Sequence, residues 1–341
     1  MVRKRRDQQN ENQPTMHDVA RVAGVSQMTV SRVMRGSGYS SNNVRDQVHK
    51  AAREIGYVHN RLAAGIAAYD NPLVGVILPT LQNRVFTEVL TGISETLGEC
   101  GLRPVFGVSE YDPQAEEDLV FDLLSWRPRG MILSGLEHNR PVREIIERTG
   151  VRAAEIMDVD AEPISACFGI SHQRAGAEMA QHLIDRGYRR FCYIASQGGH
   201  DLRATKRFEA FALRIAEAGG TLLASQTADG ASSMLLGRCM TAEMLDRNPP
   251  PDAIYYANDD LAAGGLMEAL ARGMDVPRDI AIAGFNGLEF LEALPMRITS
   301  TATPRYDIGK AAADWIVGTE NSQMDAGRLV LEAKLIQGDT T

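Results

Sequence analysis

From residue 72 to the end of the chain, short apolar runs alternate with longer stretches in which apolar residues recur at helical spacing. Residues 73–78 have the composition of a buried strand, and 86–97 the pattern of an amphipathic helix. Repeated units of this kind favour parallel sheets covered by helices on both sides, so we predict an α/β body. Because 341 residues exceed one typical domain, we expect more than one core. The further strands predicted by this pattern are 103–108, 130–133, 153–157, 190–195, 221–226, 253–257 and 280–283.

The first sixty residues have a different texture, with three short helical patterns separated by turn residues. Thr15, with Asp18 three residues later, is typical of a capping-box start, and Gly24 ends that helix. Ser26 can cap a second helix after a tight turn, and Ser41 a third. Three short helices with a turn of three to four residues between the first two indicate a helix-turn-helix unit.

The outward face of the second helix carries side chains suited to DNA. Val30 and Val33 face inward, whereas Gln27 and Arg32, which can reach base edges, share the opposite face. A generic three-helix bundle would show the same apolar spacing, so the polar face is what favours DNA binding. The candidate DNA-contacting residues of this unit are Thr15, Ser26, Gln27, Met28, Thr29, Ser31 and Arg32.

Charge is distributed unevenly along the chain. The formal net charge is −8, yet residues 1–70 carry eleven Lys and Arg against six Asp and Glu, a net of +5, which leaves −13 for the rest. A basic head on an acidic body is typical of a chain whose N-terminal part meets a polyanion. The basic run at 3–6 can equally be a solvated tail, so charge alone is weak support.

Three stretches of the head carry a family resemblance. They read D-V-A-R-V-A-G-V-S-Q-M-T-V-S-R-V (18–33), V-R-D-Q-V (44–48) and I-G-Y-V-H-N-R (55–61). In this pattern the chain resembles the lactose-repressor (LacI/GalR) family. Further along, I-L-P-T-L-Q-N-R-V-F-T-E-V-L-T-G-I (77–93) is similar to the gluconate-repressor branch of that family.

The resemblance implies an α/β architecture with an N-terminal three-helix helix-turn-helix head, a hinge, and a two-lobed periplasmic-binding-protein-like core of parallel sheets. In the hinge it assigns DNA contacts to Asn60, Arg61 and the apolar minor-groove wedge Ile66. His59 departs from the family's usual proline, which makes the hinge entry less rigid. The implied division is a disordered basic tail at 1–14, the head at 15–59, the hinge at 60–71 and the core at 72–341, with lobe 1 at about 72–170 plus 300–330 and lobe 2 at about 171–299 plus the C-terminal strand.

Ligands of such lobes bind beyond the carboxyl ends of the strands, where this chain has several polar residues. The resemblance maps the family's ligand-contacting arginine onto Arg207, with Phe211 as its aromatic partner, and the family's strand-end aspartate onto Asn286, which removes a carboxylate. The T-P-R of 303–305 places Arg305 near the same cleft. Each polar residue alone could instead be a helix cap or a surface ion pair. The candidate ligand-binding residues are Asn83, Phe86, Asp158, Arg203, Thr205, Arg207, Asn258, Asn286 and Arg305.

The motifs of several enzyme classes are missing from the sequence. G-x-G-x-x-G, G-x-x-x-x-G-K-[ST], H-E-x-x-H and G-x-S-x-G do not occur, which argues against dinucleotide, phosphate-loop, zinc-protease and serine-hydrolase chemistry. The four cysteines form no C-x-x-C pair, so we expect reduced thiols, no metal and no cofactor. Without a long apolar stretch or an apolar leader, we expect a cytoplasmic protein with no membrane partner.

These observations predict a homodimeric transcriptional repressor, not an enzyme, whose partners are double-stranded operator DNA and a small sugar or sugar-acid effector. Two heads that read half-sites related by a two-fold axis require a two-fold protein. A gluconate-like acid is favoured because Arg203, Arg207 and Arg305 are potential carboxylate ligands. A neutral sugar such as a disaccharide, or more remotely a solute-binding protein, is the alternative.

Overall fold

The computed structural model describes residues 14–34, 40–58, 71–196, 200–319 and 323–341. The chain divides into two compact units, Met1–Asn71 and Pro72–Thr341. Each unit has its own hydrophobic core.

The first unit is a small bundle of α2 (Met16–Ala23), α3 (Gln27–Met34) and α4 (Asn42–Ile55). Thr15 and Asp18 form the predicted capping box, and Gly24 ends α2 in the left-handed conformation with φ of 63°. Ser41 caps α4 through the Val44 N–H. The core shared by the three helices consists of Val19, Ala20, Ala23, Val30, Val33, Val48, Ala51 and Ala52.

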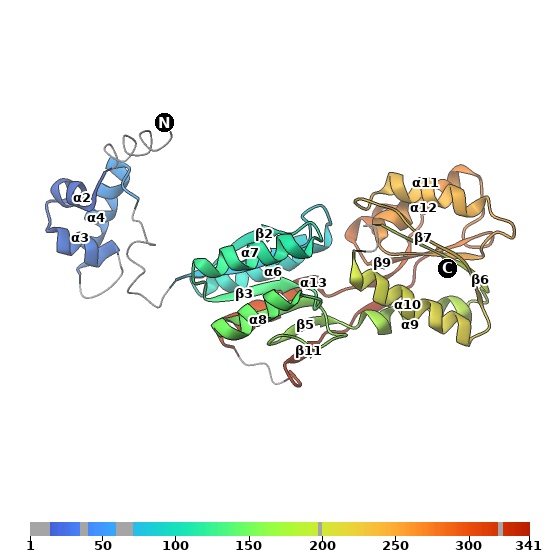
Figure 1. Ribbon diagram of the computed structural model, residues 1–341. Coiled ribbons are helices and arrows are strands. Elements are labelled where there is room, and N and C mark those ends of the chain that lie inside the picture. The colour runs from blue at the N-terminus through green and yellow to red at the C-terminus, as the bar shows by residue number, and fades with distance from the viewer. Residues whose placement is uncertain (1–13, 35–39, 59–70, 197–199, 320–322) are drawn as a thin grey trace, which may run out of the picture. The chain divides into compact units, whose positions relative to one another are not determined.

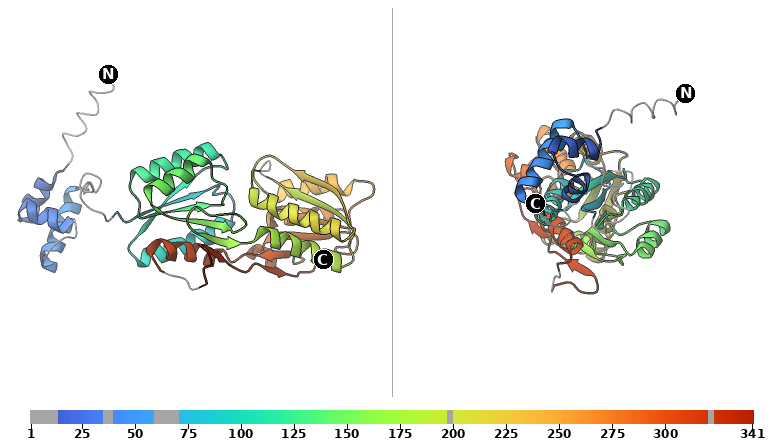
Figure 2. Two further views of the ribbon diagram at one scale, coloured as in Figure 1. Left: turned by 60° about the horizontal axis from the view of Figure 1, so that its bottom comes forward. Right: turned by 90° about the vertical axis from the view of Figure 1, so that its left-hand side faces the viewer.

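Lobe 1 of the second unit is built on a six-stranded sheet of order β11-β5-β4-β3-β1-β2, in which every pairing is parallel. Side chains alternate between its faces, one packed on α6 and α13 and the other on α7 and α8. Figure 2 shows this sheet between its two helix layers. The strands are β1 (Leu73–Leu78), β2 (Arg103–Val108), β3 (Gly130–Ser134), β4 (Arg152–Asp158), β5 (Cys167–Ile170) and β11 (Arg328–Val330), and the helices α6 (Val85–Glu99), α7 (Pro113–Ser125), α8 (Arg140–Thr149) and α13 (Arg305–Val317).

Lobe 2 repeats the architecture with a sheet of order β12-β10-β9-β8-β6-β7, parallel except for the antiparallel β12 at one edge. In Figure 1, α9 and α10 lie on one side of this sheet and α11 and α12 on the other. The strands are β6 (Arg190–Ala195), β7 (Thr221–Thr227), β8 (Ala253–Tyr256), β9 (Ala281–Asn286), β10 (Thr299–Ala302) and β12 (Lys334–Ile336), and the helices α9 (His172–Asp185), α10 (Leu202–Glu217), α11 (Met234–Leu245) and α12 (Asp259–Ala271), with a 3-10 turn at Glu289–Ala293.

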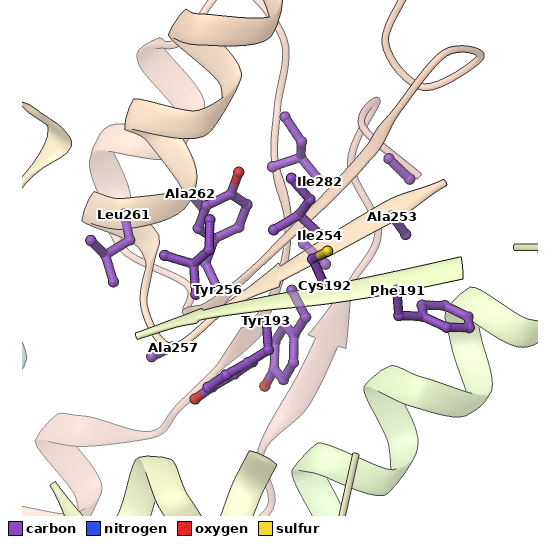
Figure 3. Packing of buried hydrophobic residues seen from close by; sticks show 14 of the residues in the cluster. Phe191, Cys192, Tyr193, Ala253, Ile254, Tyr256, Ala257, Leu261, Ala262 and Ile282 are labelled. Atoms are coloured by element: carbon purple, nitrogen blue, oxygen red, sulfur yellow. The ribbon is translucent and has the colours of Figure 1, made fainter. Parts of the chain in front are cut away.

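Neighbouring tyrosines fill both faces of the lobe 2 sheet. Tyr193 stacks on Phe208 of α10, with ring centroids 4.6 Å apart. Tyr256 points to the opposite face, where its hydroxyl lies 2.8 Å from Thr241 Oγ1 of α11. Figure 3 shows Ile254, Ile282 and Cys192 packed beside Tyr256, which lies next to Leu261 and Ala262 at the start of α12.

The predicted α/β class, with a helix-turn-helix head and a two-lobed parallel-sheet core, is confirmed. The pattern missed β5, β10 and β11, which have four, four and three residues. The chain passes between the lobes after β5, after β10 and after β11. The chain was expected to return to lobe 1 at about residue 300. It returns after Ala302, because β10 pairs with β9 of lobe 2 as far as that residue.

Candidate functional site

The second helix of the head presents a polar face. Gln27, Met28 and Arg32 are exposed, Met28 by 73%, while Val30 and Val33 are buried. The Ser26 hydroxyl accepts the Thr29 N–H at 3.1 Å and hydrogen-bonds the Thr29 hydroxyl at 2.9 Å, which begins α3 as predicted. These bonds hold the first turn of α3 in place, so that its exposed side chains project from a well-defined helix start.

The three candidate DNA contacts of the hinge, Asn60, Arg61 and Ile66, lie outside the described residues. Thr15 is exposed and takes part in the capping box, in which its hydroxyl donates to Asp18 Oδ2 at 2.7 Å. Ser31 is half-buried on α3.

Side chains of both lobes meet at the carboxyl ends of the strands, in what we call the interlobe cluster: Ser134, Glu137 and Asp158 of lobe 1 with His172, Asp201, Arg203, Lys206 and Arg207 of lobe 2. Arg203 donates to Ser134 Oγ at 2.8 Å and to Asp201 Oδ1 at 3.3 Å. Its guanidinium lies 5.7 Å from the centroid of the Phe86 ring. The predicted residues Phe86 and Arg203 therefore come together across the lobes.

Arg207 is held at three points. Its Nη1 donates to His172 Nδ1 at 2.8 Å, its Nη2 donates to the Ala257 carbonyl at 2.9 Å, and its Cζ lies 3.7 Å from the Phe285 ring centroid. Since a guanidinium can only donate, His172 Nδ1 is an acceptor, and Nε2 donates to the Met157 carbonyl at 2.8 Å. Burial, together with Arg207 and Arg203, lowers the pKa of His172, which keeps the ring neutral.

The cations of the interlobe cluster differ in their acidic partners. Arg203 is paired with Asp201, and Lys206 with Asp158 at 2.6 Å and with Glu137. Burial raises the pKa of Asp201, but Arg203 and Arg207 outweigh it, so that the pKa falls and the carboxyl is ionised. Arg207 hydrogen-bonds no carboxylate of the described residues, and its buried Nε has no partner among them.

Arg305 belongs to a neighbouring group at the start of α13. Its Nη1 donates to the Asn286 carbonyl and to Thr303 Oγ1, and its Nη2 donates to Glu88 Oε1 at 2.8 Å. Asn286 is buried with φ of 114°. Arg305 thus ties the end of β9 to α6, and its charge already faces a carboxylate.

The remaining predicted residues, Asn83, Asn258 and Thr205, form local hydrogen bonds, and Asn258 is the N-cap of α12. Asn83 Oδ1 accepts the Val85 N–H at the start of α6, and Asn258 Oδ1 accepts the Leu261 N–H at the start of α12. Asn258 also donates to Ser232 Oγ at 2.6 Å. Thr205 donates back to the Asp201 carbonyl at 3.4 Å.

Sequence reasoning missed His172, Asp201, Lys206 and Tyr111. Tyr111 has φ of 61° and follows Glu110, with φ of 51°, in the turn after β2. Burial, and then the charge of Asp201, raises the pKa of its hydroxyl, while Arg203 acts in the opposite direction. Non-glycine residues in the left-handed region are uncommon and occur at functional sites. The one signal in the sequence for these residues is the segment D-L-R-A-T-K-R (201–207), which has four ionisable groups in seven residues.

Within the described ranges no three His, Cys, Asp or Glu side chains could together hold a metal ion. None of the helices there combines the length and apolar character that crossing a bilayer requires.

Comparison with known proteins agrees with this architecture. Residues 15–60 match the model for bacterial regulatory proteins of the lacI family, and 180–341 the model for a periplasmic binding protein-like domain. The HTH-type transcriptional regulator GntR of Pseudomonas aeruginosa is 37% identical over 329 residues, 95% of this chain and 93% of that protein.

Solved structures agree as well. A LacI-family transcriptional regulator from Silicibacter pomeroyi has a TM-score of 0.90 and 43% identity, covering 96% of this chain and 99% of that one. The transcription regulator GntR from Chromobacterium violaceum has a TM-score of 0.73 and 34% identity, covering 79% of this chain and 98% of that one.

A helix-turn-helix head on a two-lobed periplasmic-binding-protein-like body defines a class of DNA-binding regulators. The chain belongs to the LacI family of bacterial transcriptional regulators. It is close to the GntR regulators, and its relatives are regulators of transcription, not enzymes.

Proposed function

We propose that this regulator is a homodimeric cytoplasmic repressor that binds double-stranded operator DNA and responds to a sugar-acid effector held between its lobes. Exposure of Gln27, Met28 and Arg32 on α3 supports base reading in the major groove. We assign phosphate contacts to Thr15, Ser26, Thr29 and Ser31, and Asn60, Arg61 and Ile66 would extend binding through the hinge.

Dimerisation follows from the size of the head. One unit of three short helices offers few base contacts, whereas operator affinity is typically reached by two heads on half-sites related by a two-fold axis. Exposed large apolar side chains on the body, such as Phe106 on the edge strand β2 and Phe121 on α7, supply surface that a second copy can cover.

The observation that carries the effector proposal is the state of Arg207. Its guanidinium is buried and oriented by His172, Ala257 and Phe285, yet it hydrogen-bonds no carboxylate of the described residues. A carboxylate is the group that a preoriented guanidinium binds best. The acid group of a gluconate-like effector would therefore contact Arg207. We assign further contacts to Asn83, Phe86, Asp158, Arg203, Thr205, Asn258, Asn286 and Arg305.

A neutral sugar is the second candidate, because the charges nearby are otherwise matched. Arg203, Lys206 and Arg305 each have a carboxylate partner. Hydroxyl and amide groups also lie after β6 and β8 of lobe 2, with Ser196 Oγ 2.5 Å from Ser232 Oγ and Asn258 bonded to the same serine. Such groups suit sugar hydroxyls of either effector class.

A thermal-shift screen of sugars, sugar acids and sugar phosphates tests the proposal, because a ligand raises the melting temperature as RT ln(1 + [L]/Kd) grows. Gel shifts with operator DNA and each hit then give the direction of the response. Stabilisation by gluconate or 2-ketogluconate, together with a change in operator affinity, is the expected result. Stabilisation by neutral sugars alone would favour the second candidate.

A further inference from the structure

Lys206 connects the two lobes through its ammonium group. It lies on α10 of lobe 2, and its Nζ donates to Asp158 Oδ2 at 2.6 Å and forms an ion pair with Glu137. Asp158 ends β4, and Glu137 follows β3, so both acids belong to lobe 1. No other ion pair between described residues joins the lobes.

Lys206 is the cation that forms an ion pair with Asp158 among the described residues. Its side chain is fully buried, and its Oδ1 accepts the Asp160 N–H at 2.9 Å. Only 16% of the Lys206 side chain is exposed. Burial by itself lowers the pKa of Lys206, but the hydrogen bonds to Asp158 and Glu137 together outweigh it. The pKa is therefore raised overall, and the ammonium stays charged. A buried carboxylate that loses its cation is strongly destabilising.

The backbone just before Asp158 is strained where the end of β4 faces lobe 2. Met157, the preceding residue, has φ of 78°, a left-handed conformation that side chains other than glycine rarely adopt. Its carbonyl accepts a hydrogen bond from His172, the first residue of α9 in lobe 2. The end of β4 therefore contacts lobe 2 through two successive residues, one of them ionised.

We infer that Lys206 is a positioning residue for the effector response. It neutralises buried Asp158 only while the lobes are in contact, and thereby sets the fraction of molecules in the conformation that retains effector. The inference rests on the proposed function in one respect, that the effector binds between the lobes. The ion pair itself makes no assumption about the effector's identity.

The chain supplies its own probes of the lobe separation. Its four cysteines include two exposed ones, Cys100 at the end of α6 in lobe 1 and Cys239 on α11 in lobe 2, while Cys167 and Cys192 are buried. Spin labels on the exposed pair report the distance between lobes in the full-length protein. Dilution with unlabelled protein suppresses distances between subunits.

Lys206→Met is the test variant and Lys310→Met the matched control, because Lys310 pairs with Asp314 within one helix of lobe 1. We expect Lys206→Met to lengthen or broaden the label distance without effector and to weaken gluconate binding roughly tenfold. Lys310→Met leaves both unchanged. Adding Asp158→Asn to Lys206→Met removes the unpaired charge and restores the wild-type distance in part. Gluconate affinity is the readout that a merely structural lysine would leave unchanged.

Identical distance distributions in Lys206→Met and wild type would overturn the inference. If wild type binds neither gluconate nor 2-ketogluconate while Lys206→Met still changes the distance, the effector assignment fails and the positioning role stands. If gluconate binds equally well to both proteins although the distance changes, Lys206 has no part in effector retention, and the inference is wrong.

Discussion

The guanidinium of Arg207 on α10 lies over the ring of Phe285 on β9, with Cζ 3.7 Å from the ring centroid. Cation–π contact and the two hydrogen bonds to His172 and Ala257 leave the group little rotational freedom. A donor that is oriented in advance loses less entropy when it binds a ligand. Arg207 is therefore the residue that we expect to bind the acid group of the effector.

Helices α6 and α13 pack so closely that glycine is required at their crossing. A Cβ on Gly92 would overlap the Tyr306 carbonyl, and one on Gly309 the Val89 carbonyl. We expect Gly92→Ala to lower the free energy of unfolding by about 1–3 kcal/mol, because backbone atoms cannot yield as a side chain can. A lower melting temperature in calorimetry measures the effect.

Gly98, on the same helix, is the control. A Cβ there meets nothing within 4 Å, so Gly98→Ala should stabilise the protein by about 0.5–1 kcal/mol through the helix propensity of alanine. Equal melting temperatures for the two variants would contradict the close packing of α6 and α13.

The stability of the body should depend on pH through Glu155 on β4. Burial raises the pKa of this fully buried carboxyl from 4.5 to about 7, against the opposing effect of His138, whose Nε2 lies 3.5 Å away. The folded state therefore holds a proton that the unfolded state releases, and the free energy of unfolding falls as the pH rises from about 4.5 through about 7, by on the order of 3 kcal/mol at most.

Urea titrations at several pH values test this dependence. Glu155→Gln, which keeps the shape without the charge, should show a smaller loss of stability across that window. The control is Glu144→Gln, which removes a carboxyl from a partly exposed ion pair with Arg140 on the same lobe. An unchanged pH dependence in Glu155→Gln would assign the titration to other groups.

On the head, Gln27→Ala and Arg32→Ala should each weaken specific operator binding by about 1–3 kcal/mol while changing binding to random duplex much less. The reason is their exposure on α3, opposite the buried Val30 and Val33. Fluorescence anisotropy with operator and scrambled duplex at matched salt measures both. Arg53→Ala, on exposed surface of α4, is the control for loss of a positive charge. Equal losses on the two duplexes would exclude a base-reading role.

Local signals were readable from the sequence, and long-range ones were not. Thr15, Gly24 and Ser41 act on neighbouring residues, so their spacing alone predicted the helix ends. Strand β10 (T-S-T-A) has no apolar run, and its polar side chains are buried because Ser300 donates to Asp259 and Thr299 bonds Thr341. Those partners lie about forty residues away along the chain.

The candidate site shows the same division. Arg207 could be mapped from a family pattern, whereas His172 and Lys206 are defined by contacts between lobes that only folding creates. From the sequence, Arg203, Arg207 and Arg305 were all potential carboxylate ligands of a sugar acid. In the structure Arg203 pairs with Asp201 and Arg305 with Glu88, which leaves Arg207 as the candidate ligand for the effector's acid group.

Substitution of Arg207 should therefore distinguish a sugar-acid effector from a neutral sugar. Calorimetry should show tighter binding of gluconate or 2-ketogluconate than of glucose or sucrose. Arg207→Ala should weaken binding of the acid by about 1.5–3 kcal/mol, the range for hydrogen bonds to charged groups, and reduce the preference for acid over glucose. Arg305→Ala is the comparison, since its guanidinium already serves Asn286 and Glu88. Arg305→Ala should lower the melting temperature, and it should change the preference for acid over glucose less than Arg207→Ala does. Tighter binding of a neutral sugar than of either acid would refute the sugar-acid assignment and leave the DNA-binding regulator intact.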